Sequence, residues 1–210
     1  MIIPGIFESD FEEIKRKIKL VDSAARLIQV DVADGELVDG KTFTDIYKLD
    51  GIDTMSKFDL DLMVQNPIKY LEKKVQKAEK ISMLIDAEEY IEKFIETAKK
   101  LKYKVGLSLR PSTPVEKIEE YLDELDYVQF FTIRPGGSGR EFQIEVLEKL
   151  EKFRTDYPSV PFQVDGGVDK DYLPLVLEAG AIDAVITSHI FNTQNPKEAL
   201  EYFMGVYRNR

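Results

Sequence analysis

The sequence predicts an α/β fold, a (β/α)8 TIM barrel formed as one domain by residues 1–210. Eight short apolar or β-branched runs alternate with segments of helical spacing, at roughly 26 residues per strand–helix unit, near the lower size limit of such barrels. Two of the runs, at residues 29–35 and 163–167, end in an aspartate followed by glycine. No Ser-, Gly- or Pro-rich linker divides the chain.

The elements follow in order from their local signals. Apolar or β-branched runs predict strands at residues 2–6, 27–32, 58–64, 81–85, 105–109, 127–133, 162–164 and 184–187. Helical periodicity predicts helices at residues 10–20, 66–79, 87–101, 114–125, 142–157, 171–179 and 196–207. Ser9 or Asp10 would cap the first helix, Pro67 would begin the second, and Gly180 would end the helix at 171–179. The region 41–53 holds turn residues and at most one short helix.

An open, doubly wound sheet is the alternative architecture. It rarely needs eight regular units, and no Gly-x-Gly-x-x-Gly follows the first strand. The barrel is therefore the better interpretation.

The composition limits the environment and the partners. A net charge of −10 disfavours binding to nucleic acid and to anionic membranes. The absence of cysteine excludes disulfides and thiolate metal ligands and fits a cytoplasmic protein, and the chain start shows no export signal. An anionic small ligand would need a local site, which glycine loops can supply through backbone N–H groups.

The loops after the last strands predict such a site. In a barrel these loops face the active site, and here they are polar and rich in glycine. Their candidate ligand-binding residues are Gly136, Gly137, Ser138, Gly139, Gly166, Gly167, Thr187 and Ser188. The glycines of one loop alone would only indicate a turn, but two glycine loops and a serine at the eighth strand end favour phosphate binding.

Asp31 and Asp165 are the candidate catalytic pair. Strands far apart in the sequence would bring both to one mouth, where one carboxylate removes a proton and the other returns it.

The whole chain resembles the ribulose-phosphate 3-epimerase family of ribulose-phosphate-binding barrels. The resemblance lies in motifs at most strand ends, in order and at comparable spacing. These motifs are Pro4-Gly5-Ile6-Phe7, Val30-Asp31-Val32-Ala33-Asp34-Gly35, Asp59-Leu60-Asp61-Leu62-Met63-Val64-Gln65-Asn66-Pro67, Arg110-Pro111-Ser112-Thr113-Pro114, Thr132-Ile133-Arg134-Pro135-Gly136 and Val164-Asp165-Gly166-Gly167-Val168.

The resemblance implies an isomerase of pentose phosphate metabolism. Family members interconvert D-ribulose 5-phosphate and D-xylulose 5-phosphate through an enediolate, and Asp31 and Asp165 fill the positions of the two aspartates that exchange the C3 proton. Met63 and Arg134 would join the substrate contacts, and a homo-oligomer is expected.

The family binds a divalent metal through two histidines and the same two aspartates, but this chain departs from that set. Gln29 and Asp61 stand at the histidine positions, so the implied ligands are Gln29, Asp31, Asp61 and Asp165. This all-oxygen set favours Mg²⁺ or Mn²⁺ over Zn²⁺, or no metal at all. Arg110 and Arg134 replace two family asparagines and would neutralise the carboxylates or bind extra negative charge on a ligand.

Other departures also fall at the predicted mouth. Gly5 replaces a serine that touches substrate, Ala33 replaces a methionine, and Thr187 replaces a glycine beside the phosphate. His189, the only histidine, is interpreted as a packing or capping residue.

Three hypotheses follow. The leading one is an epimerase acting on a phosphorylated ketose. The alternative is a degenerate barrel that binds sugar phosphates or anions without turnover. Decarboxylase chemistry ranks last, because the strand with Asp59 and Asp61 lacks the lysine of an Asp-x-Lys-x-x-Asp array.

Overall fold

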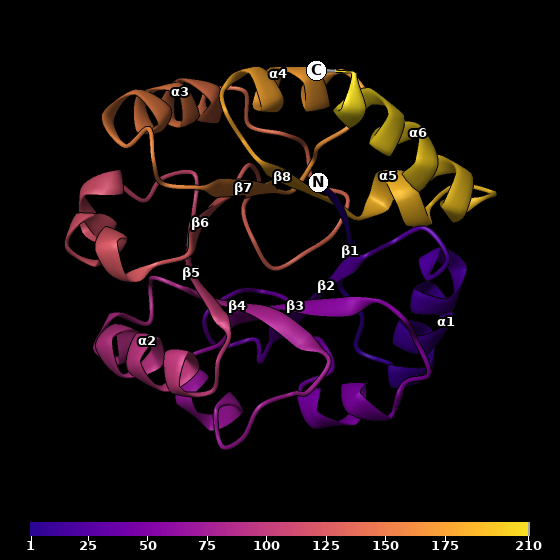
Figure 1. Ribbon diagram of the computed structural model, residues 1–210, viewed down its shortest axis with the longest axis horizontal. Coiled ribbons are helices and arrows are strands. Elements are labelled where there is room, and N and C mark those ends of the chain that lie inside the picture. The colour runs from indigo at the N-terminus through magenta and orange to yellow at the C-terminus, as the bar shows by residue number, and fades with distance from the viewer. Residues whose placement is uncertain (210) are drawn as a thin grey trace.

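The computed structural model describes residues 1–209 and forms a closed barrel of eight parallel strands, with each strand paired to its neighbour in the chain and β1 paired to β8 (Figure 1). The TIM-barrel prediction is confirmed. The strands are β1 (Ile2–Ile6), β2 (Leu27–Ala33), β3 (Lys57–Met63), β4 (Ala78–Leu84), β5 (Lys104–Leu109), β6 (Tyr127–Phe131), β7 (Phe162–Asp165) and β8 (Asp183–Ile186).

Helices surround the barrel (Figure 1). They are α1 (Phe11–Val21), α2 (Ile91–Lys100), α3 (Val146–Asp156), α4 (Tyr172–Glu178), α5 (Ser188–Phe191) and α6 (Pro196–Arg208). Asp10 caps α1 by accepting from the Glu12 N–H, as one of the two predicted caps. Short 3-10 helices lie at Ile46–Gly51, Pro67–Tyr70, Glu88–Tyr90 and Val115–Glu124.

The helix expected at residues 66–79 is wrong. Only a 3-10 turn, Pro67–Tyr70, forms there, and β4 already begins at Ala78. The backbone N–H groups of Glu72 and Val75 donate to the hydroxyls of Tyr47 and Tyr103, at 3.2 and 2.7 Å. Tertiary partners thus satisfy donors that a helix would direct to its own carbonyls.

Two further helices differ from their predictions in form or length. The segment expected as a helix at 114–125 is a 3-10 helix over Val115–Glu124. The helix expected from residue 142 begins at Val146, because Phe142 stacks on Tyr172 at 4.2 Å between ring centres and the Gln143 N–H donates to the Thr132 carbonyl. The short helix α5 is not among the predicted helices.

The interior of the barrel is layered. At the bottom, Ile3, Leu27 and Val185 form an apolar plug. Near the mouth an apolar collar is formed by Ala33, Val38, Met63, Leu84 and Phe131. Between them lies a polar layer of buried side chains, namely Gln29, Asp31, Asp59, Asp61, Lys80, Ser82, Ser108, Gln129, Gln163 and Asp165. Every buried side-chain nitrogen or oxygen in residues 1–209 has a hydrogen-bond partner.

The main hydrophobic core lies between the barrel and its helices. Alternate strand residues point outward to it, such as Val30, Leu60 and Val164, and they meet helix residues such as Ile14 and Phe94. Among the helices described, none combines the length and the apolar character needed to cross a bilayer.

Candidate active site

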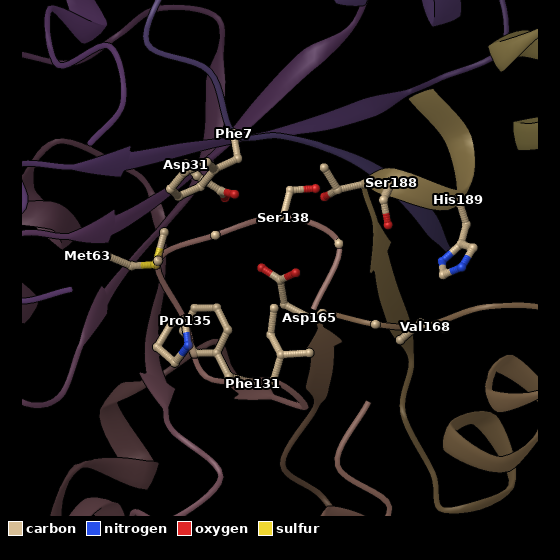
Figure 2. A pocket seen from close by; sticks show the side chains of 17 residues that line it. Phe7, Asp31, Met63, Phe131, Pro135, Ser138, Asp165, Val168, Ser188 and His189 are labelled. Atoms are coloured by element: carbon tan, nitrogen blue, oxygen red, sulfur yellow. The ribbon is translucent and has the colours of Figure 1, made fainter. Parts of the chain in front are cut away.

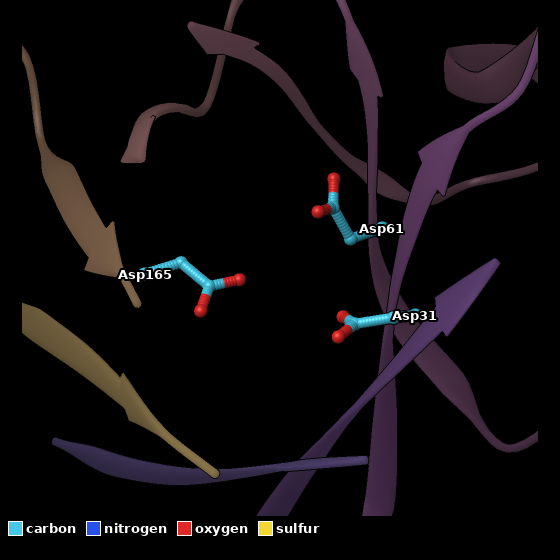
Figure 3. Close-up of side chains that lie close together, drawn as sticks. All are labelled: Asp31, Asp61 and Asp165. Carbon is cyan, nitrogen blue, oxygen red and sulfur yellow. The ribbon is translucent and has the colours of Figure 1, made fainter. Parts of the chain in front are cut away.

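Three aspartates meet inside the barrel just below the collar. Asp31 is on β2, Asp61 is its register partner on β3, and Asp165 ends β7 on the opposite wall. Figure 3 shows the Asp165 carboxylate directed toward the other two across the barrel. One carboxylate oxygen of each lies within 4.8 Å of the others. Strand alternation turns all three side chains inward, so the closed sheet brings distant residues together.

Gln29 bridges the two predicted acid/base residues. Its Nε2 donates to Asp31 Oδ1 at 2.8 Å and to Asp165 Oδ2 at 2.6 Å. Both amide hydrogens are therefore directed at carboxylates, and Gln29 Oε1 faces Gln163 instead. The structure thus places Gln29 as a donor to two candidate metal ligands, with its oxygen turned away from the cluster.

Asp61 is held by three side-chain donors. Ser82 Oγ and Ser108 Oγ donate to its Oδ1 at 2.8 and 3.3 Å, and Gln129 Nε2 donates to its Oδ2 at 2.8 Å. These donors lie on β4, β5 and β6, whereas Asp31 and its hydrogen-bonding partner Gln29 lie on β2. The Asp61 carboxylate is therefore held from the other side of the barrel.

Burial raises the pKa of all three carboxyl groups, and the charges of neighbouring carboxylates add to the increase. For Asp31, burial and then the charges of Asp165 and Asp61 raise the pKa well above its usual range, against a lowering by the Gln29 hydrogen bond. Burial raises the pKa of Asp61 to about 7, while its hydrogen bond from Ser82 lowers it. Burial, followed by the charge of Asp61, raises the pKa of Asp165 to about 8. The cluster therefore holds protons near neutral pH or needs a cation.

The donor set fits a divalent metal. Three converging carboxylates are hard oxygen ligands, and a cation among them would offset the unfavourable burial of their negative charges. Asp31, Asp61 and Asp165 are the residues that could supply the ligand atoms.

A cavity opens above Asp31 and Asp165 (Figure 2). The predicted ligand-binding residues that line it are Met63, Gly136, Gly137, Ser138, Gly139, Gly166, Gly167, Thr187 and Ser188. Asp61 and Gln29 lie beneath it, so the structure brings the predicted acid/base pair and the predicted phosphate loops to one space.

Gly166 and Gly167 need their glycine identity for the backbone. Their φ angles are +108° and +64°; an added Cβ would overlap the Ile133 side chain at the first and lie 2.8 Å from the Phe142 backbone at the second. The backbone of the tight turn after β7 thus packs directly against Ile133 and Phe142, with no room for side chains at these two positions.

Gly5 and Thr187, two departures from the family pattern, touch each other. A Cβ at Gly5 would overlap Thr187 Oγ1 and lie 2.8 Å from Val185. The missing side chain on β1 therefore makes room for the added one after β8.

The two arginines of the predicted rim are engaged elsewhere. Arg134 does not line the cavity; its guanidinium is two-thirds exposed and pairs with Asp39 at 2.8 Å. Arg110 pairs with Asp86 at 2.7 Å and donates to the Leu37 carbonyl at 2.8 Å. Neither arginine forms an ion pair with the carboxylate cluster in this arrangement.

Some cavity residues were missed from the sequence. His189, interpreted as a packing or capping residue, is exposed and lines the cavity (Figure 2). Phe7, Phe131 and Val168 also line it and give it an apolar side. These residues lie at or just after the ends of strands, on the positions that alternate toward the interior. That placement is the signal by which the sequence could have identified them as cavity residues.

The fold and site define a barrel enzyme with a buried carboxylate cluster below a glycine-lined cavity. Comparison with known proteins extends this. Residues 1–191 match the Ribulose-phosphate 3 epimerase family. Ribulose-phosphate 3-epimerase of Bacillus subtilis is 30% identical over 97% of this chain and 98% of its own, and that of Synechocystis sp. is 34% identical over 95% and 91%. The chain belongs to the ribulose-phosphate 3-epimerase family.

Solved structures share the architecture at lower identity. KGPDC from Streptococcus mutans, solved as a ligand complex, aligns with a TM-score of 0.77 and 14% identity over 99% of this chain and 97% of its own. Orotidine 5'-phosphate decarboxylase from Pyrococcus horikoshii aligns with a TM-score of 0.72 and 16% identity over 99% of each chain. At these identities the likeness establishes the barrel fold alone.

Proposed function

We propose that this protein interconverts D-ribulose 5-phosphate and D-xylulose 5-phosphate by exchanging the proton at C3, with Asp31 and Asp165 as the acid/base pair. The observation that carries the proposal is two buried carboxylates from opposite barrel walls facing one cavity, in a chain of the epimerase family. A barrel that binds without turnover is not favoured, since the family match and the cluster of three buried aspartates both support catalysis.

The two aspartates suit inversion at one carbon. One carboxylate removes the C3 proton from one face, and the electron pair of the broken C–H bond forms a C2=C3 double bond as charge moves to the C2 oxygen. The other aspartate then protonates C3 from the opposite face. The exchange requires one of the two carboxyl groups to be ionised and the other protonated at the start of each turnover.

The cavity loops would hold the distant phosphate. Ser138 and Ser188 line the cavity with hydroxyl groups, and the glycines of the loops after β6 and β7 allow close approach to backbone N–H groups. Binding energy from this end would orient C3 between the acids.

Asp31, Asp61 and Asp165 would hold a divalent cation, with Mg²⁺ or Mn²⁺ favoured by three carboxylate oxygens. When bound, such a cation supplies charge stabilisation for the negative oxygen that develops next to C3. Gln29 directs its N–H groups to two of these carboxylates and so restrains their orientation.

Solvent deuterium exchange tests the assignment. In D₂O with Mg²⁺ or Mn²⁺, the wild-type protein is expected to label C3 of both pentulose phosphates. Asp31→Asn and Asp165→Asn should each lower epimerisation by roughly 10²–10⁴-fold. Each variant should still exchange the C3 proton of one epimer, namely the epimer whose C3 proton faces the remaining aspartate. The two variants should therefore label different epimers.

The control is Asp39→Asn, which changes an exposed carboxylate of the rim. It should leave the C3 labelling of both epimers near the wild-type rate. Absence of labelling by the wild-type protein with every divalent metal, or normal epimerisation by Asp31→Asn, would contradict the proposal.

A further inference from the structure

A buried chain of hydrogen bonds runs beneath the carboxylate cluster. It starts at Lys80 on β4, passes through Gln163 on β7, and divides to Gln29 on β2 and Gln129 on β6. Each of these side chains is at most 7% exposed, so solvent does not compete for their hydrogen bonds.

At the lower end of this chain of hydrogen bonds, Lys80 determines which way the Gln163 side-chain amide is oriented. Its ammonium group pairs with Asp59 Oδ2 at 3.3 Å and with Asp183 Oδ2 at 3.6 Å, lies over the Tyr127 ring, and donates to Gln163 Oε1. Gln163 Nε2 in turn donates to Asp59 Oδ2 at 3.2 Å. A flipped Gln163 amide would place its NH₂ against the ammonium and its oxygen against the carboxylate. Because an ammonium only donates and a carboxylate only accepts, one amide orientation is allowed.

That orientation passes to the next two amides. Gln163 Nε2 lies 3.4 Å from Gln29 Oε1 and also donates to Gln129 Oε1, so with Asp59 its two hydrogens face three acceptors and one hydrogen is shared between two of them. Both oxygens are therefore turned down toward Gln163, and both NH₂ groups face the cluster above. Gln29 then donates to Asp31 and Asp165, as described above, and Gln129 donates to Asp61.

We propose that Lys80 is a positioning residue which, through Gln163, fixes Gln29 and Gln129 as donors to the three aspartates. The inference rests on the proposed function for its catalytic consequence. Gln29 and Gln129 supply N–H groups, not oxygen ligands, so each carboxylate is held in one rotamer with its remaining lone pairs free for metal or substrate. Preorganised carboxylates are what a two-faced proton exchange needs.

The orientation itself is measurable without activity. Hydrogen-bond-mediated ¹⁵N–¹³C couplings in the full-length protein should connect Gln29 Nε2 to the carboxyl carbons of Asp31 and Asp165, and Gln129 Nε2 to that of Asp61. The proposal would be overturned if the wild-type protein showed no coupling from these amide nitrogens to the carboxyl carbons, or if the nitrogens of Gln29 and Gln129 coupled to the Gln163 side chain instead.

A paired substitution removes the source of direction. Lys80→Met alone leaves the buried Asp59 carboxylate without a cation, so the informative variant is Lys80→Met/Asp59→Asn, which removes this pair of charges and leaves Asp183 its pairing with the N-terminal amino group of Met1. In it the amide couplings to the aspartates should weaken or disappear. The kcat should fall roughly 10–100-fold while the KM for the pentulose phosphate stays within about threefold. A folded double variant with wild-type couplings and kcat would refute the role of Lys80.

Lys149→Met is the matched control. Lys149 is a partly buried lysine that donates to backbone carbonyls, among them that of Arg110 at 3.0 Å, outside this chain of amides. Its replacement should leave the cluster couplings and the kcat-to-KM pattern unchanged.

Gln163→Glu, made together with Asp59→Asn so that the new carboxylate does not face another carboxylate, reverses the hydrogen-bonding polarity at this position while keeping the shape. A carboxylate at 163 still accepts from Lys80 but cannot donate to Gln29 or Gln129, so their NH₂ groups should turn down toward it and their couplings to the aspartates should vanish. Couplings that persist in this variant would contradict the relay. If instead the wild-type protein shows the couplings but no epimerisation, the proposed function fails and the relay stands.

Discussion

At the scale of single residues, three carboxylates and one amide form the candidate site of this barrel. Asp31 and Asp165 were identified from the sequence because each follows a β-branched run and precedes a glycine turn. Asp61 was identified by resemblance alone. The donor role of Gln29 could not be read from its position, because an amide offers either an oxygen or an NH₂, and its neighbours decide which one faces the cluster.

Asp61→Asn tests the metal site at this scale. The change removes one of three charged ligand candidates while keeping a similar shape, so we expect the affinity for Mn²⁺ to fall about 10–100-fold. Isothermal titration calorimetry measures the affinity. Asp39→Asn, on the exposed rim, should bind Mn²⁺ as the wild type does, and equal affinities in Asp61→Asn and wild type would remove Asp61 from the ligand set.

At the scale of elements, contacts between neighbouring segments explain most differences from prediction. Strands were placed to within a few residues, since the β-branched pattern reflects burial on both faces in a parallel sheet. Helices were predicted less accurately at residues 66–79 and 114–125. Apolar spacing alone does not distinguish an α-helix from a 3-10 helix or from a loop whose N–H groups find side-chain partners.

Gly5 and Thr187 predict coupling between β1 and the end of β8. Gly5→Ser should destabilise the protein by about 1–3 kcal/mol, because its Cβ meets Thr187 Oγ1 and no space remains. In a Thr187→Gly background the same change should cost at least about 1 kcal/mol less. Urea unfolding of the wild type, the two single variants and the double variant measures the coupling. If the changes in the free energy of unfolding are additive, the contact between positions 5 and 187 does not account for the cost of Gly5→Ser.

Asp22 links the end of α1 to the segment before β3, and its pKa gives a pH prediction. Burial raises the pKa of this carboxyl, but hydrogen bonds from Thr54, Ser56 and the Met55 N–H outweigh burial and lower it overall. The folded protein therefore binds this proton less tightly than the unfolded chain does. The stabilisation is full above the unfolded pKa of about 3.9 and is lost as the pH falls through the folded value.

Asp22→Ala should consequently cost about 1–3 kcal/mol at pH 7 through lost hydrogen bonds. The difference from wild type should shrink as the pH is lowered below about 4. Urea unfolding at several pH values measures it. A difference that stays constant down to the acid limit would show that ionisation of Asp22 contributes nothing.

At the scale of the whole molecule, barrel closure brings repelling charges together and so couples metal binding to stability. The carboxylates come from β2, β3 and β7, on facing walls. A cation that binds only the folded state stabilises it by about 2.7 kcal/mol at a hundred times its Kd. We therefore expect Mn²⁺ to raise the Tm of chelator-treated protein by roughly 5–10 °C. Differential scanning calorimetry measures this, and an equal rise in Asp61→Asn would place the bound ion elsewhere.

The predicted homo-oligomer also belongs to this scale and stays a prediction, testable by light scattering coupled to size exclusion. So does the assignment of the cavity loops to phosphate, which inorganic phosphate titrated against the C3 exchange would test as a competitor.

The linear pattern of residues was enough to determine the eight alternating units, the barrel, and the strand ends that carry Asp31, Asp165 and the glycine loops. These depend on local periodicity and on the rule that strand ends share one face. Only the tertiary structure decided the direction of the buried amides, the fit of Gly5 against Thr187, and the pairing of Arg134 with Asp39. Each of these depends on which side chains meet across the closed sheet, and no local pattern encodes a contact between strands distant in sequence.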